Sequence, residues 1–233
     1  YDAYDEDALN LNAIKETLSM HVQFYGYNPI MTPIYEQTEL FARSAGESSD
    51  IVTKEMFTFL DKGGRSITLR PELTAGVIRA IVNNKLYATK DLPLKYYYCG
   101  PAFRYERPSA GRYRQFNQFG VECVGINSYY HDVECISLGY NSLIEIGFPN
   151  VILKINTLGD ANSRKAYQEA LKSYFADKIQ YMCSDCKRRY EINVLRILDC
   201  KDPDDRPYIE GAPKMSDYLS DESKEYFKKV LEL

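Results

Sequence analysis

Residues 100–122 form two alternating stretches joined by a loop rich in proline and glycine. Because side chains alternate across a strand with period two, Phe116, Gln118, Gly120 and Glu122 share one face, and the largely apolar residues between them share the other. A strand that turns a ring, a carboxamide and a carboxylate the same way, with a bare glycine between them, is typical of a ligand-pocket floor. The pattern predicts an antiparallel hairpin with its chemistry on one face. The alternative is a hairpin whose polar face is exposed to solvent and binds no ligand.

Arginine dominates the loop of this hairpin. Four arginines and one glutamate give residues 104–114 a net charge of +3. Guanidinium groups bind phosphates through paired hydrogen bonds, so this charge suits a polyanion such as a nucleoside triphosphate.

A second polar corner follows a predicted strand over 66–70. Pro71-Glu-Leu-Thr74 ends that strand and begins a predicted helix over 74–86, which places Glu72 and Thr74 at an exposed corner. Glu and Thr are both favoured in the first turn of a helix, so an ordinary helix start is the alternative.

Hydrophobic periodicity assigns the remaining elements up to residue 160. A loop is expected at 46–50 and a tight turn at Asp61-Lys-Gly-Gly64, and Pro33 favours an edge strand because it has no N–H. Further expected helices cover 5–25, 39–45 and 129–147, and further expected strands cover 30–35, 54–60, 94–99 and 151–158.

After residue 160 the sequence becomes charged and helical. Helices are expected over 164–177, 183–196 and 221–233. The sequence therefore predicts an α+β chain with two domains, 1–160 built on an antiparallel sheet flanked by helices and 161–233 mostly helical.

Composition limits the setting of the protein. The formal net charge is −4, so any nucleic-acid contact must come from a local basic patch. No run of eighteen apolar residues exists and the first residues are acidic, which predicts a cytoplasmic protein with no membrane contact.

The six cysteines are expected to be reduced thiols. Cys183-Ser-Asp-Cys186, with Cys200 downstream, has the first half of a zinc-ribbon spacing. Neither histidine, His21 nor His131, lies near enough in sequence to be a fourth ligand. We therefore expect a structural loop and no metal, with a zinc site, in a zinc-dependent nucleic-acid binder, as the alternative.

Several of these stretches resemble one family. Phe103-Arg-Tyr-Glu106, Gly111-Arg-Tyr-Arg-Gln-Phe116 and Gln118-Phe-Gly-Val-Glu122 resemble motif 2 of the class II aminoacyl-tRNA synthetases, in the form found in histidyl-tRNA synthetase. The stretches 69–75, 156–160 and 193–201 resemble other parts of the same enzymes. This resemblance implies the class II fold, with residues 161–233 as an inserted helical domain over the tRNA acceptor stem. It also implies a homodimer built through the N-terminal helix and the Pro33 strand.

The resemblance implies a reaction and roles for site residues. A histidine–tRNA ligase activates L-histidine with ATP and Mg²⁺ and transfers it to tRNA(His). Arg104 would bind the α-phosphate and the attacking carboxylate as the catalytic residue. The other implied ATP-binding residues are Glu106 and Phe116 for adenine and Arg112 for the γ-phosphate. The implied histidine-binding residues are Glu72, Thr74 and Gln118 for the α-amino group and Glu122 for the imidazole.

The resemblance stops before the family's pattern does. The family's second histidine element, motif 3 and the anticodon-binding domain have no counterpart in these 233 residues. We therefore expect the N-terminal part of a histidyl-tRNA synthetase, with little or no activity alone. The alternatives are a non-catalytic regulatory subunit of the ATP phosphoribosyltransferase type and a tRNA-sensing module. The intact ATP-side residues favour the enzyme.

Overall fold

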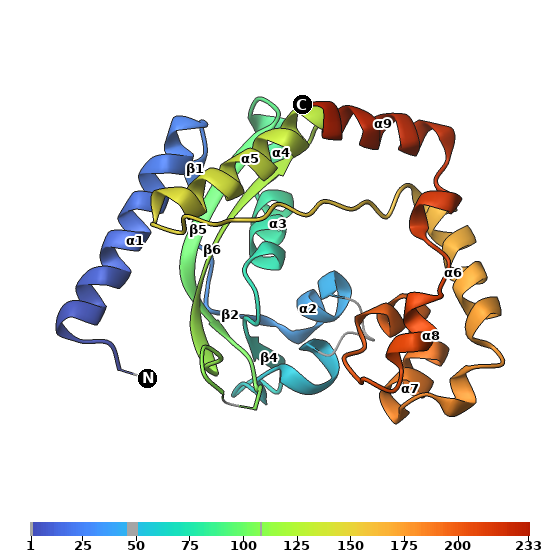
Figure 1. Ribbon diagram of the computed structural model, residues 1–233. Helices are drawn as coiled ribbons and strands as arrows, with labels where there is room; N and C mark the ends of the chain where they lie inside the picture. Colours follow the sequence, from blue (N-terminus) through green and yellow to red (C-terminus); the bar gives the residue numbers. More distant parts are fainter. Residues whose placement is uncertain (1, 46–50, 108) are drawn as a thin grey trace. The chain divides into compact units, whose positions relative to one another are not determined.

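The computed structural model describes residues 2–45, 51–107 and 109–233, which divide into two compact units, Tyr1–Leu153 and Lys154–Leu233 (Figure 1). We call them unit 1 and unit 2. The loop expected at 46–50 lies outside the described residues.

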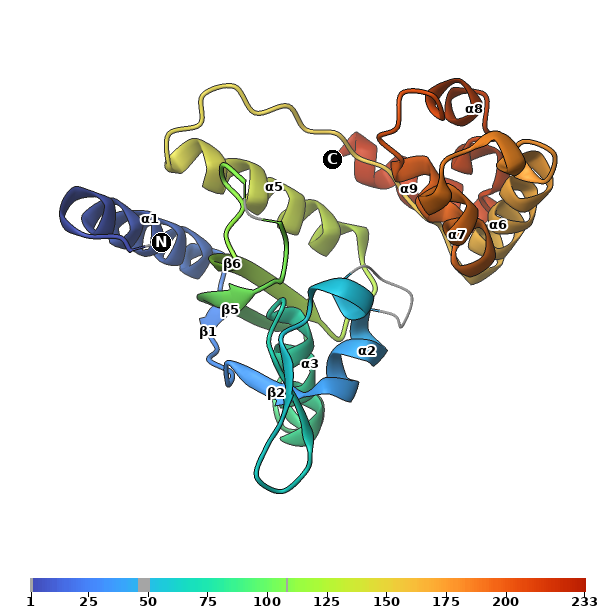
Figure 2. The same ribbon diagram turned by 90° about the horizontal axis from the view of Figure 1, so that it is seen from below.

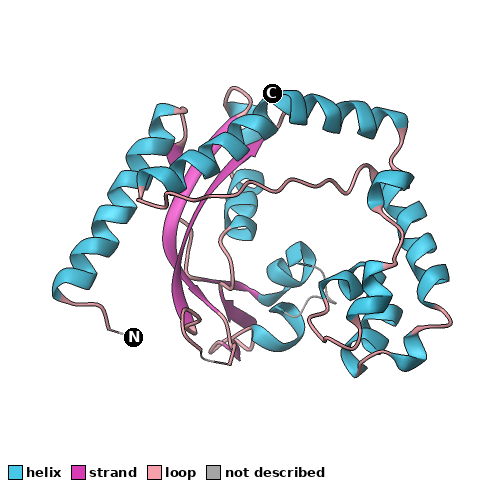
Figure 3. Ribbon diagram, viewed as in Figure 1, coloured by secondary structure: helices cyan, strands magenta, loops and turns pink. Residues whose placement is uncertain are grey.

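Unit 1 contains two three-stranded sheets (Figure 3). In the first, β5 pairs in parallel with β1 and antiparallel with β6, in a register that runs from Leu94 opposite Val124 to Phe103 opposite Gln115. In the second, β4 lies between β2 and β3, and both pairs are antiparallel. The strands are β1 (Asn28–Pro29), β2 (Tyr35–Gln37), β3 (Thr58–Leu60), β4 (Ser66–Leu69), β5 (Leu94–Phe103) and β6 (Gln115–Val124).

The predicted hairpin is confirmed as β5 and β6, and helices cover both of its faces (Figure 2). On one face, Tyr96 and Tyr98 of β5 pack with Val77 of α3. On the other, Tyr97 packs with residues of α1 and α5. The helices of unit 1 are α1 (Asp5–Phe24), α2 (Thr38–Ala45), α3 (Thr74–Asn83), α4 (Leu86–Thr89) and α5 (Tyr129–Glu145), with a π-helix η1 (Ile51–Glu55).

Three strand predictions are wrong in whole or in part. The strand expected at 30–35 is instead a crossing from β1 to β2, because Pro29 and Pro33 lack an N–H and the chain changes sheet between them. The strand expected at 54–60 is shortened to β3, with η1 taking its first residues. Within the described chain, residues 151–158 form no strand. The alternation of apolar and polar residues predicts which way side chains would point, but a strand also needs a neighbouring strand to hydrogen-bond with.

Unit 2 is helical around its own core of apolar side chains, including Leu171, Phe175 and Ile197. The helix expected at 183–196 is split, because Asn193 has extended backbone (φ −157°). The helices are α6 (Ala161–Phe175), α7 (Ser184–Ile192), α8 (Arg206–Glu210) and α9 (Asp221–Glu232), with 3-10 turns η2 (Ile179–Tyr181), η3 (Val194–Asp199) and η4 (Met215–Tyr218).

One carboxylate joins the starts of two helices in unit 2. Asp160 precedes α6 and accepts a hydrogen bond from the Ser163 N–H at 2.8 Å. It also accepts from the hydroxyls of Ser220 and Ser223, at the start of α9. These hydrogen bonds, with the Ser163 N–H first, hold the pKa of Asp160 well below its usual range.

Among the helices formed by described residues, none is both long enough and apolar enough to cross a bilayer.

Candidate functional site

Tyr98 of β5 stands at the centre of the polar face of the hairpin. Its hydroxyl donates to Glu122 Oε1 at 3.2 Å, lies 3.2 Å from Thr74 Oγ1 and accepts from Gln118 Nε2 at 3.5 Å. The structure therefore brings together three predicted residues from two separate stretches of sequence, Thr74 from one and Gln118 and Glu122 from the other. We call Thr74, Tyr98, Gln118 and Glu122 the Tyr98 cluster.

Gly120 makes this arrangement possible. It lies opposite Tyr98 in the β5–β6 ladder, and a Cβ at this position would lie 2.5 Å from Tyr98 Cζ. The tyrosine ring thus crosses the strand over a residue that has no side chain. The glycine that interrupts the polar face in the sequence therefore marks the place where the Tyr98 ring comes close to the backbone of β6.

Glu72 lies beside the Tyr98 cluster but has a structural partner. Its Oε1 accepts from the Ala75 N–H at 2.9 Å, so it caps the start of α3 as an ordinary helix start would. Its charge is close enough to contribute to the raised pKa values of Glu122 and Tyr98. The ordinary helix start is therefore confirmed, and both Glu72 and Thr74 are half-buried, so the expectation of an exposed corner is wrong. A ligand-binding role for this corner stays a prediction.

Burial sets the electrostatics of the cluster. It raises the pKa of Glu122, while hydrogen bonds from Thr74 and Tyr98 oppose the shift. Burial also raises the pKa of Tyr98 to about 12. Gln118 Oε1 is buried and has no hydrogen-bond partner among the described residues. A half-buried carboxylate and an unpaired carbonyl oxygen favour a ligand that brings N–H donors or positive charge.

Arg104 and Arg112 of the hairpin line a hollow of about 410 Å³, which we call the arginine hollow. Arg104 Nε donates to the Pro71 carbonyl at 2.9 Å, and its guanidinium carbon lies 5.1 Å from the centre of the Phe116 ring. Glu106 lies 3.3 Å from Arg112 Nη1 and 4.0 Å from Arg104 Nη1. The lining residues are Arg104, Glu106, Gly111, Arg112, Tyr113, Phe116 and Asn117.

The Tyr98 cluster and the arginine hollow follow one another along β6. Phe116, Gln118 and Glu122 share a face of the strand, as predicted, and at about 3.3 Å per residue they span roughly 20 Å. One face therefore offers arginines and a ring at one end and a carboxylate at the other. This is long enough for two ligands side by side.

Sequence reasoning missed one residue of this site, Tyr98, and one that lies against the strand residue opposite Gln118, Arg70. The sequence places Tyr98 in the expected strand over 94–99 without a role in the site, and it predicts no role for Arg70. Arg70 is buried, and it donates to the carbonyls of Pro101 at 2.7 Å and Thr32 at 2.9 Å. Its guanidinium occupies the space that a Cβ at Gly100 would take. Glycines at 100 and 120, in otherwise regular strands, were the available signal.

A larger hollow of about 580 Å³ lies beside the second sheet. Glu36 and Arg79, which form an ion pair at 2.8 Å, are among its lining residues. It contains none of the predicted site residues.

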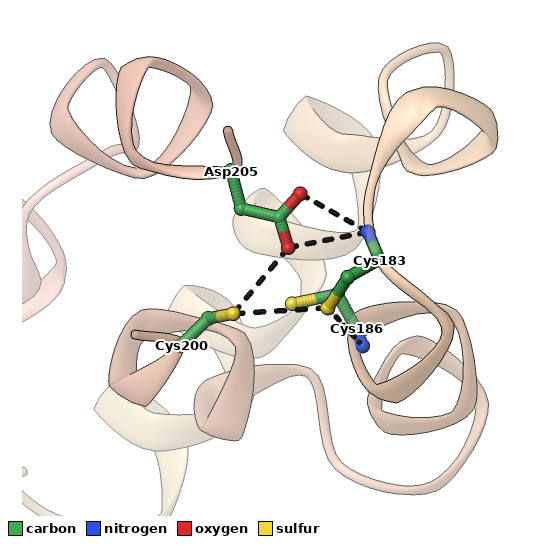
Figure 4. Close-up of side chains that lie close together, drawn as sticks. All are labelled: Cys183, Cys186, Cys200 and Asp205. Carbon is green, nitrogen blue, oxygen red and sulfur yellow. Dashed lines mark hydrogen bonds between the residues drawn. The ribbon is translucent and has the colours of Figure 1, made fainter. Parts of the chain in front are cut away.

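Unit 2 holds a separate group of potential metal ligands. Cys183, Cys186, Cys200 and Asp205 each offer a ligand atom, and these atoms all lie within 4.8 Å of one another (Figure 4). We call these four residues the cysteine cluster. The expectation that no fourth ligand lies nearby is wrong, because Asp205 completes the set.

Comparison with known proteins gives a consistent picture. The family model described as Histidyl-tRNA synthetase matches residues 1–178. A histidine–tRNA ligase of Geobacillus thermodenitrificans is 53% identical over 206 residues, which are 88% of this chain and 48% of that protein. One of Thermosipho melanesiensis is 50% identical over 229 residues, 98% of this chain and 54% of that protein. The chain thus spans about half the length of the curated relatives it matches.

Solved structures agree on the fold. All of this chain aligns with 52% of apo Staphylococcus aureus histidyl-tRNA synthetase, with a TM-score of 0.77 and 39% identity. A Bacillus halodurans protein described as an ATP phosphoribosyltransferase regulatory subunit/histidyl-tRNA synthetase aligns with a TM-score of 0.66 over 100% of this chain and 63% of that one. Its 19% identity supports the α+β fold alone.

Proposed function

The chain belongs to the histidyl-tRNA synthetase family, and from that premise we propose that it is the N-terminal part of a histidine–tRNA ligase. That ligase activates L-histidine with ATP and transfers it to tRNA(His). The observation that carries the proposal is the meeting of Thr74, Gln118 and Glu122 around Tyr98, next to the arginine hollow.

Histidine fits the Tyr98 cluster by its hydrogen bonds. The unpaired Gln118 Oε1 and the Thr74 hydroxyl would accept from the α-amino group, together with Glu72. Glu122 would accept from an imidazole N–H. An analogue without that N–H leaves a buried carboxylate unpaired, which is the source of specificity.

ATP fits the arginine hollow by charge. Arg104 would bind the α-phosphate and the attacking carboxylate of histidine, and Arg112 the γ-phosphate, so that catalysis is positioning plus stabilisation of phosphate charge. Adenine would stack on Phe116 and donate from its amino group to Glu106. Glu106 forms an ion pair with Arg112. When the triphosphate binds Arg112, this ion pair would break, and Glu106 could then accept a hydrogen bond from adenine.

Magnesium, which the family resemblance implies, has a poor set of ligands here. Among described residues, the carboxylate lining the arginine hollow is that of Glu106, and it is paired with Arg112. These residues do not make a magnesium site by themselves, so the arginines carry the charge stabilisation in this proposal.

Exposed apolar side chains support a homodimer. Phe24 of α1 is 90% exposed and Met31, just after β1, is 95% exposed, and Leu9 and Met20 are also exposed on α1. Large exposed apolar groups on a helix and on the segment just after it, as here on α1 and at Met31, are typical of a protein interface. We assign this region to the dimer contact, residues 161–233 to an inserted domain near the tRNA acceptor stem, and the protein to the cytoplasm.

The alternative, a non-catalytic regulatory subunit, is not favoured. Arg104, Glu106, Arg112 and Phe116 all line one hollow, which a protein that binds no ATP would have no reason to keep.

The test is NMR titration of the chain with L-histidine and, separately, with ATP. We expect histidine to shift resonances of the Tyr98 cluster and ATP to shift those of the arginine hollow. Glu122→Gln should lose the histidine response and keep the ATP response, whereas Glu145→Gln, at the end of α5, should keep both. Histidine-dependent pyrophosphate exchange by the chain alone should be weak or absent.

Two results would overturn the proposal. If millimolar histidine shifts nothing around Tyr98, the histidine site is wrongly placed. If residues 1–233 exchange pyrophosphate at the rate of a whole ligase, these residues already form a complete active site, and the proposal that they are only part of one is wrong.

A further inference from the structure

The cysteine cluster is assembled from the ends of three helical elements in unit 2. Cys183 caps α7, Cys186 lies in its first turn, Cys200 follows η3, and Asp205 precedes α8. In sequence these residues are separated by 2, 13 and 4 others. Cys186 is fully buried and Asp205 is 1% exposed.

The sulfur positions fit a tetrahedral metal better than a disulfide. Cys183 Sγ and Cys200 Sγ are 3.8 Å apart. Two sulfurs bound to zinc at about 2.3 Å, at the tetrahedral angle, are also about 3.8 Å apart. The sulfurs of a disulfide are bonded at about 2.05 Å, so these two thiols are free.

Backbone N–H groups surround the ligand atoms as an outer shell would. The Cys186 N–H donates to Cys183 Sγ at 3.4 Å, and the Asp202 N–H points to Cys200 Sγ at 3.5 Å. The Cys183 N–H donates to both carboxylate oxygens of Asp205, at 3.0 and 3.2 Å (Figure 4). Such donors stabilise thiolates and orient a carboxylate.

Asp205 has an unusual environment for a carboxylate. It begins α8, yet its side chain makes no cap hydrogen bond to that helix and turns toward the cysteines instead. Its hydrogen bonds come from the Cys183 N–H and the Cys200 thiol, and none of the described Lys, Arg or His side chains forms an ion pair with it. A buried carboxylate needs a compensating charge, and a divalent cation would supply it.

We propose that Cys183, Cys186, Cys200 and Asp205 form a structural zinc site in unit 2. Three thiolates and one carboxylate suit Zn²⁺, and magnesium and calcium prefer oxygen ligands alone. Four protein ligands leave no open position, so the site is structural rather than catalytic. The metal would hold the starts of α7 and α8 and the end of η3 together. This proposal does not rest on the proposed function.

The test begins with the metal content of the chain purified under reducing conditions without added metal. We expect about one zinc per chain by elemental analysis. After the metal is removed, Co²⁺ alone should give the visible bands of tetrahedral cobalt and a thiolate-to-cobalt charge-transfer band, and Zn²⁺ should abolish both.

Matched variants separate this site from its surroundings. Cys200→Ser and Asp205→Asn should weaken zinc binding by at least about 100-fold, the upper end of the loss when a mere outer-shell partner is removed. Cys99→Ser, a cysteine of β5, and Asp204→Asn, the exposed neighbour, should bind as the parent does. Circular dichroism would show whether any variant fails to fold.

Three outcomes would overturn the proposal, and the parent chain alone suffices for two of them. One is a reduced chain with no zinc and no tetrahedral cobalt spectrum. Another is a Cys183–Cys200 disulfide in protein purified without oxygen. The third is equal zinc retention by folded Cys200→Ser, which would mark the metal as adventitious.

Discussion

The Tyr98 cluster and the cysteine cluster gather polar side chains in opposite ways. The first lies mainly on two long strands, where a regular ladder fixes which residues share a face. The second lies on helix ends and short turns, where no repeat relates one ligand to the next. The first leaves Gln118 Oε1 without a hydrogen-bond partner in the described part of the chain, while the second encloses its ligand atoms within 4.8 Å of one another.

This difference matches what each cluster has to do. A substrate site must keep unpaired groups for a ligand that comes and goes, and a regular sheet can hold them in place. A structural metal site is complete when its ligands meet, so irregular segments suffice once the ion holds them. The comparison predicts that each cluster can be damaged without damaging the other.

Removal of zinc should have the largest effect, and only in unit 2. If the chain is kept in free zinc at 1,000 times the dissociation constant, chelation should cost about 4 kcal/mol of unit 2 stability. Hydrogen exchange would report this as faster exchange at Cys186 and Ile197. The β5 amide of Tyr98 serves as the internal control. Equal acceleration of exchange in both units would show that the two clusters are not independent.

Gly120→Ala should have the next largest effect, and only in unit 1. The new Cβ would lie 2.5 Å from Tyr98 Cζ, so the ring must move, at a cost of about 1–3 kcal/mol in the free energy of unfolding. Chemical denaturation measures the loss, and zinc content should stay unchanged.

Gly139→Ala is the control for that substitution. Gly139 lies within α5, and among the described residues outside this helix no atom lies within 4 Å of the position that its Cβ would take. Alanine there should therefore stabilise the protein by about 0.5–1 kcal/mol. If Gly120→Ala were equally harmless, Tyr98 would not be held across β6 as described.

Tyr98→Phe should cost less, about 1 kcal/mol, because one hydroxyl is lost from a half-buried network. It removes a hydrogen bond that opposes the raised pKa of Glu122, so that pKa should rise further. The folded-state pKa of Glu122 lies above its unfolded value of about 4.3. The free energy of unfolding therefore falls as the pH rises from the unfolded pKa to the folded pKa. The deficit of the variant should therefore grow from pH 4 to pH 7.

NMR titration of the Glu122 carboxyl carbon checks this prediction. Tyr96→Phe is the matched control, because Tyr96 pairs instead with Lys90 at 3.1 Å. A Glu122 pKa that moves equally in both variants would contradict the contact with Tyr98.

Asp160→Asn should have the smallest effect, confined to unit 2. The lowered pKa of Asp160 means that the ionised carboxylate contributes stability above the unfolded pKa of about 3.9, and that this is lost as pH falls toward the folded value. Urea midpoints of parent and variant should therefore differ at pH 7 and converge in acid. Glu169→Gln, on the exposed surface of α6, should show no such convergence. If the urea midpoints of Asp160→Asn and the parent did not converge in acid, the hydrogen bonds to the Asp160 carboxylate would be refuted.

Local patterns predicted much of this fold for identifiable reasons. Period-two alternation fixed the face of β6 that carries Phe116, Gln118 and Glu122, and helical periodicity located α1, α5, α6 and α9. The same alternation failed over residues 151–158, where Ile152 is 80% exposed. A strand needs a second strand to hydrogen-bond with, and a local sequence pattern cannot show whether a distant segment supplies one.

The family, the hairpin and the order of its chemical groups could all be predicted from the residues in chain order, because these features depend on neighbours in the chain and on regular backbone geometry. Three contacts became visible only in the folded chain: Tyr98 joins Thr74 to Glu122, Arg70 fills the space beside Gly100, and Asp205 meets three cysteines. These contacts join distant or irregular segments, and their geometry exists only after the chain has closed around them.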